Sequence, residues 1–85
     1  MAALPGVNAE LALTARRIRR LWEQLPEADQ PPRVVADWRA MRREVEAACS
    51  AGKRDEALAL IADYREQAEQ QLTAALLPAP SQVTA

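Results

Sequence analysis

The feature that most constrains the fold is Gly52, which stands between two long stretches whose apolar residues recur every three or four positions. This spacing places apolar side chains along one side of an α-helix. Glycine readily adopts the left-handed conformation that ends many helices, so the first of these helices should end just before Gly52. Because the turn is short, the two helices must pack antiparallel. The sequence therefore predicts a helical hairpin, with helices at about 31–51 and 54–77.

The two helices of this hairpin differ in the width of their apolar faces. In the first helix the apolar residues advance by four, three, four and three positions, which gives a narrow seam: Val34, Trp38, Met41, Val45 and Ala48. In the second helix, for which Asp55 is the expected N-cap, they cover more of the surface: Ala57, Leu58, Leu60, Ile61, Tyr64, Ala68, Leu72, Ala75 and Leu76. We therefore expect part of the second helix to extend beyond what the first can cover.

A third helix is predicted at about 9–25, ahead of the hairpin. Its apolar stripe has the same spacing and consists of Leu11, Ala15, Ile18, Trp22 and Leu25. Asn8 is a favourable N-cap, and Pro26 should end the helix because it lacks an amide hydrogen. Asp29 or Gln30 is the expected cap of the helix that follows. Both tryptophans lie on inward stripes, so we expect them to join this helix to the first helix of the hairpin.

Composition agrees with an all-α protein organised as a three-helix bundle. The chain has 85 residues, is dominated by strong helix formers and has few β-branched residues. We expect one helical domain at 8–77, a flexible N-terminus at 1–7 and a disordered tail at 78–85. Nineteen residues are alanine and none is phenylalanine. Alanine buries little surface, so a partner is expected to supply part of the burial.

Several classes of chemistry lack their usual residues. There is no histidine, one cysteine (Cys49) and only two glycines. These counts argue against a disulfide framework, a histidine-based catalytic site, a metal centre and a glycine-rich phosphate loop. We expect no enzyme activity, cofactor or small-molecule substrate, and an inert Cys49. No signal peptide or membrane span is recognisable, which favours a cytoplasmic location, and the bias toward arginine and alanine is typical of a GC-rich bacterial gene.

A run of arginines marks the predicted N-terminal helix: Arg16, Arg17, Arg19 and Arg20. Residues 1–26 carry four Arg against two Glu, whereas residues 52–85 carry three basic and five acidic residues. The run is therefore open to three interpretations. It can be a solvated face, it can pair with the acidic last helix of the same or another copy, or it can bind an anionic partner such as nucleic acid. The overall net charge of −1 argues against a dedicated nucleic-acid protein.

One segment of the hairpin, AACSAGKRDEALALIADYREQ, resembles one helix–turn–helix unit of a tetratricopeptide repeat. The shared features are a turn of small residues with glycine, followed by acidic-Glu-Ala-Leu at the start of the next helix. The helix before the turn lacks the Trp-Leu-Gly-Tyr pattern of that family, and the chain contains no second unit. The resemblance implies an antiparallel hairpin and a peptide-binding scaffold.

These observations favour a small protein-interaction module, such as an adaptor, an assembly chaperone or a regulatory subunit. It would bind another protein or itself, as a homodimer, by packing helix against helix. The alternative is a nucleic-acid-binding regulator that uses the basic run. Partner-binding candidates are the residues of that run, the exposed leucine beside it and the apolar residues of the last helix: Leu13, Arg16, Arg17, Arg20, Leu60, Tyr64, Leu72 and Leu76.

Overall fold

The computed structural model describes residues 6–77, and within this range the chain forms helices and no strand. The elements are α1 (Val7–Glu23), the short 3-10 helix η1 (Glu27–Asp29), α2 (Pro32–Ser50) and α3 (Arg54–Leu76). The predicted all-α bundle of three helices is confirmed.

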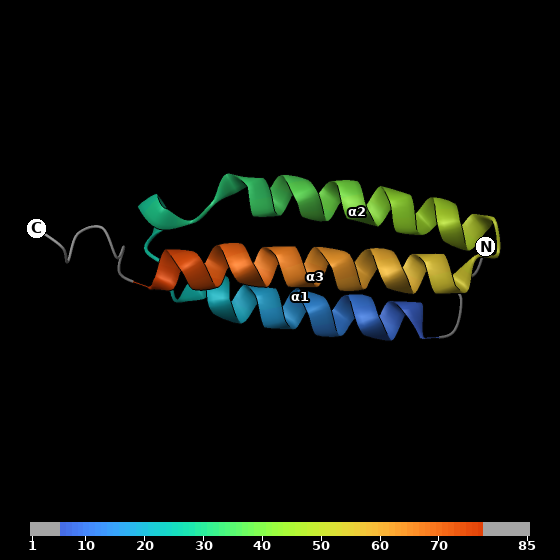
Figure 1. The fold of residues 1–85 in the computed structure, drawn as a ribbon, viewed down its shortest axis with the longest axis horizontal. Helices are drawn as coiled ribbons and strands as arrows, with labels where there is room; N and C mark the ends of the chain where they lie inside the picture. The colour runs from blue at the N-terminus through green and yellow to red at the C-terminus, as the bar shows by residue number, and fades with distance from the viewer. Residues whose placement is uncertain (1–5, 78–85) are drawn as a thin grey trace, which may run out of the picture.

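The last helix, α3, holds the bundle together. Both α1 and α2 pack along α3, whereas α1 and α2 contact each other far less closely. Figure 1 shows α3 between the other two, with α2 running antiparallel to it and α1 running in the same direction as α3. The wide apolar stripe of α3 is therefore shared by two neighbouring helices, one on each flank.

The turn between α2 and α3 ends the first helix as the sequence predicts. Gly52 has a φ of 74°, in the left-handed region. The amide of Lys53 donates to the carbonyl oxygen of Ala48 at 2.8 Å, and the amide of Gly52 donates to that of Cys49 at 3.0 Å. These two bonds form a Schellman motif, which satisfies the last carbonyl groups of α2. The next helix then begins at Arg54, with Lys53 rather than Asp55 as its N-cap.

Helix α1 begins and ends two residues earlier than the prediction of 9–25. Gly6 is its N-cap, with a φ of 88°, and the predicted cap Asn8 lies inside the helix. Val7, which we placed in a flexible N-terminus, is only 1% exposed. Burial of this side chain against the core fixes the start of α1, and the left-handed glycine before it provides the turn. Residues 1–5 and the predicted tail 78–85 lie outside the described range.

The connector between α1 and α2 closes the end of α1. The side chain of Gln30 donates from Nε2 to the carbonyl oxygens of Trp22 and Leu25, both at 3.2 Å. The prediction that Asp29 or Gln30 caps α2 was wrong, because Pro31 is the N-cap and Pro32 is the first residue of that helix. A proline at the first helical position loses no hydrogen bond, which explains why α2 starts without a side-chain cap.

The core runs along α3. Its buried apolar residues come from all three helices and the connector: Val7, Ile18, Leu25, Val34, Met41, Val45, Ala48, Ala57, Ile61, Tyr64, Ala68 and Leu72. One polar residue, Thr14 of α1, is buried with them at 0% exposure. Its Oγ1 has no hydrogen-bond partner among the described residues. The buried side of α1 is thus centred on Thr14 and Ile18, about 40° round the helix from the centre of the predicted apolar stripe.

Candidate functional site

Two grooves run beside α1, one on each of its flanks. The first, which we name the basic groove, lies between α1 and α3 and has a volume of about 620 Å³. The second, which we name the aromatic groove, lies between α1 and α2 above α3 and has a volume of about 340 Å³. The aromatic groove exists because α1 and α2 both pack on α3 and leave a furrow where their surfaces diverge.

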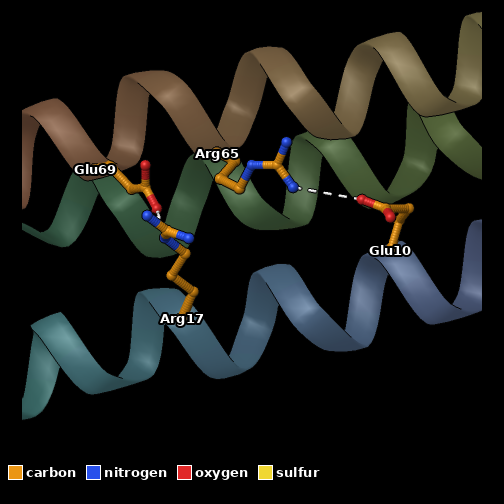
Figure 2. A network of polar contacts seen from close by, with 4 residues as sticks. All are labelled: Glu10, Arg17, Arg65 and Glu69. Atoms are coloured by element: carbon orange, nitrogen blue, oxygen red, sulfur yellow. Dashed lines mark hydrogen bonds and ion pairs between the residues drawn. The ribbon is translucent and has the colours of Figure 1, made fainter.

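The basic groove is crossed by two ion pairs that join α1 to α3. Figure 2 shows Arg17 of α1 reaching Glu69 of α3, and Arg65 of α3 reaching back to Glu10 of α1. In the second pair Nη1 of Arg65 lies 3.4 Å from Oε1 of Glu10. Such partly exposed pairs contribute about 0.2–1 kcal/mol each, so their main effect is to fix how the two helices align.

The outer edge of the basic groove is different in character. Arg16 and Arg20 line it and form no ion pair within residues 6–77. Leu13 lines it too and is 54% exposed, which is high for a large apolar side chain. The groove therefore contains four arginines and two glutamates, and both glutamates are already paired. It offers a modest excess of positive charge around one exposed leucine.

The aromatic groove is lined mainly by apolar side chains from all three helices. Its lining consists of Ala15, Ile18, Arg19 and Trp22 from α1, Val34, Val35 and Trp38 from α2, and Tyr64 from α3. Tyr64 forms the floor: its ring meets that of Trp38 edge to face, with centroids 5.5 Å apart and planes at 62°. Its hydroxyl donates a hydrogen bond to the carbonyl oxygen of Val34 at 3.2 Å. The ring contact and the hydrogen bond both tie Tyr64 of α3 to α2, the other helix of the hairpin.

Burial perturbs the chemistry of this floor. Burial, together with the smaller effect of the negative charge of Asp37, raises the pKa of Tyr64 from 10.0 to about 12. The phenol therefore stays protonated at neutral pH and acts as a hydrogen-bond donor. Arg19 is the one charged residue in the lining of the groove. Such a site suits the binding of apolar groups better than acid–base chemistry.

The predicted partner-binding residues separate into two groups. Leu13, Arg16, Arg17 and Arg20 come together along the basic groove. The others lie on α3: Leu60 and Leu76 are half-buried against the core, while Tyr64 and Leu72 are 7% and 0% exposed. A partner could not contact Leu72 without separating α3 from its neighbours, because α1 and α2 already cover the apolar stripe of α3.

Sequence reasoning did not identify the aromatic groove. We expected both tryptophans to pack in the core between the two helices, and both are indeed partly buried against it. However, Trp22 and Trp38 also line the open furrow between α1 and α2. Beside them Val35 is 40% exposed. One available signal was that Val35 and Trp38, three positions apart, both lie at the same edge of the narrow seam of α2.

Within residues 6–77 we find no cluster of three or more His, Cys, Asp or Glu side chains arranged to hold a metal ion. None of the helices in this part of the chain is both long and apolar enough to cross a membrane. Cys49 is half-buried at the edge of the core. Comparison of the chain with models of protein families, with characterised proteins and with solved structures found no match.

Proposed function

We propose that this protein is an interaction module that binds an amphipathic helix of another protein in the aromatic groove. The observation that carries the proposal is the placement of Trp22 and Trp38 on opposite walls of an open furrow, with Tyr64 as its floor. Tryptophan, tyrosine and arginine are the residue types in which binding energy most often concentrates, and all three occur in this lining.

The arrangement of the helices supports the same function. Because α1 and α2 both pack on α3 and only loosely on each other, a furrow is open between residues 15–22 of α1 and 34–38 of α2. A helix laid in this furrow would bury its apolar side chains against the tryptophans and would complete a four-helix arrangement. Binding of a helix in an apolar groove is a common mode of peptide recognition.

A nucleic-acid-binding function of the basic groove is the second candidate, favoured by the arginines Arg16 and Arg20, which form no ion pair in the described part of the chain. Two glutamates in the same groove and the pairing of Arg17 with Glu69 weaken it. Titration of labelled single- and double-stranded oligonucleotides at low and moderate salt tests this function. Binding that weakens steeply with salt would support it, and no binding at low salt would eliminate it.

Site-specific photo-crosslinking tests the interaction module. We would place a photoreactive phenylalanine analogue at Val35, which is exposed at the edge of the aromatic groove, in the full chain expressed in its native host. The matched control carries the same analogue at Ala40, which is exposed on the same helix about 140° further round. We expect a discrete adduct with another protein from the Val35 position only.

A second variant separates specific binding from chance proximity. Adding Trp38→Ala to the Val35 probe should abolish the adduct if the partner docks in the aromatic groove, provided circular dichroism shows that the helices persist. Adducts of equal yield from both probe positions, or none from either, would contradict the proposed function.

A further inference from the structure

The aromatic groove carries positive charge at its edges, and we infer that the helix it binds is acidic on both flanks of its apolar face. This inference rests on the proposed function and adds the chemistry of the partner. It comes from the position of three arginines, one on α1 and two on α2, relative to the side chains that line the groove.

On the α1 side, Arg19 itself lines the groove, four residues after Ala15. On the α2 side, Arg39 follows Val35 by four residues, and Arg42 follows Trp38 by four. Residues four apart lie on the same side of a helix, so both arginines continue the row that lines the groove. All three are exposed and form no ion pair within residues 6–77.

Acidic residues are fewer in the same place: by the same spacing of four, Glu23 follows Arg19 and Glu46 follows Arg42. No aspartate or glutamate is among the residues that line the aromatic groove. Helix by helix, α1 has four Arg against two Glu, α2 has four Arg against three acidic residues, and α3 has two Arg against five acidic residues. The side of the bundle formed by α1 and α2 is therefore basic. Glutamate or aspartate on a bound helix would meet this charge, whereas lysine or arginine would be repelled.

Charge also bears on the identity of the occupant. The acidic helix of a second copy, α3, could meet the arginines, but the apolar residues on its solvent-exposed side are all alanines: Ala59, Ala62, Ala74 and Ala75. These small side chains would not fill a groove walled by tryptophans. The chain's own residues 78–85 contain no acidic residue, so they lack the charge that the arginines would attract. The best fit is a helix of a different protein with large apolar side chains.

Designed peptides test the inference with the full-length protein. The first is an amphipathic helix of about 20 residues with leucines along one face and glutamates on both flanks. A second carries lysines in place of the glutamates, and a third carries alanines in place of the leucines. Binding is measured by tryptophan fluorescence and isothermal titration calorimetry. We expect the glutamate peptide to bind at least about tenfold more tightly than the lysine peptide, and the alanine peptide not to bind.

Charge reversal in the protein provides the complementary test. Arg19→Glu combined with Arg42→Glu should reverse the preference, so that the lysine peptide binds more tightly than the glutamate peptide. Arg33→Glu is the control, because this exposed residue lies about 180° round the helix from Arg42, away from the aromatic groove. It should leave the preference for glutamate in place. Circular dichroism and thermal melts establish that each variant folds.

The outcomes separate this inference from the proposed function. If the glutamate and lysine peptides bind equally well, and the double charge reversal does not change this, the inference of an acidic partner is wrong. The proposed function as an interaction module would still stand. Failure of both leucine peptides to bind would overturn both. Light scattering over a range of protein concentrations measures whether the protein dimerises. A dimer that dissociates in the Arg19→Glu, Arg42→Glu variant would show that a second copy occupies the groove, and would also overturn the inference.

Discussion

The folded state should lose stability between pH 10 and 12 because of a single group, Tyr64. Burial raises the pKa of Tyr64 from 10.0 to about 12 in the folded chain. Below pH 10 the phenol is protonated in both states, and its full contribution to stability is present. As the pH rises from 10 to 12, the unfolded chain releases the proton before the folded chain does, so unfolding becomes more favourable. The predicted loss therefore lies on the alkaline side.

The size of this loss follows from the shift in pKa. A shift of about 2 pKa units corresponds to about 2.7 kcal/mol when the phenol is ionised in both states. Midway, at about pH 11, the loss should be about 1.4 kcal/mol. Tyr64 is only 7% exposed, so solvent screening does not reduce this figure much. For a chain of this length such a loss is a large share of the total stability, which rarely exceeds about 10 kcal/mol.

Urea denaturation followed by circular dichroism at several alkaline pH values measures the loss. The control is Tyr64→Phe, which keeps the ring beside Trp38 but has no proton to release. The background is small, because Tyr64, Lys53 and Cys49 are the only tyrosine, lysine and cysteine of the chain. We expect the Phe variant to lose much less stability over this range. Equal losses in both proteins would refute the assignment of the raised pKa to Tyr64.

Two further substitutions test the packing and the turn. Thr14→Val replaces a buried hydroxyl, which has no hydrogen-bond partner in residues 6–77, with a methyl group of similar size. It should raise the free energy of unfolding, measured by urea denaturation, by about 1 kcal/mol. The control Thr73→Val, on the exposed side of α3, should change this free energy little. Gly52→Ala should lower the free energy of unfolding by about 1 kcal/mol and the midpoint of a thermal melt by about 4–8 °C. The reason is backbone strain, because alanine is disfavoured at a φ of 74°; its Cβ would meet no atom within 4 Å. An unchanged melt for Gly52→Ala, or a destabilised Thr14→Val, would contradict these accounts.

The sequence was sufficient to predict the helices and their order, because the relevant signals are local. Apolar spacing reports the buried side of a helix, and Gly52 marks a turn that requires a left-handed residue. The first residue of α1 was predicted less well, since it depends on Val7, whose burial is a tertiary effect. The same is true of Gln30, whose side chain closes the helix before it rather than opening the one after it.

The candidate site was harder to predict than the fold. We interpreted the wide stripe of α3 as surplus surface for a partner, and included Tyr64 and Leu72 among the partner-binding residues. In the structure two helices share this stripe, one on each flank, and both side chains are buried. The width of a stripe thus reports how many neighbours a helix has, and it does not say whether those neighbours belong to the same chain. The aromatic groove depends on the separation of α1 and α2, which no local pattern encodes.

The arginine run of α1 shows how one local pattern can hold two different roles. Consecutive residues of a helix are about 100° apart, so Arg17 and Arg19 point to nearly opposite flanks of α1. Arg17 lies in the basic groove, where it pairs with Glu69 and aligns α1 with α3. Arg19 lies in the aromatic groove and forms no ion pair in the described part of the chain. The run is therefore not a single patch for one anionic ligand: one flank helps to hold the fold together, and the other lines the groove in which we propose that a partner binds.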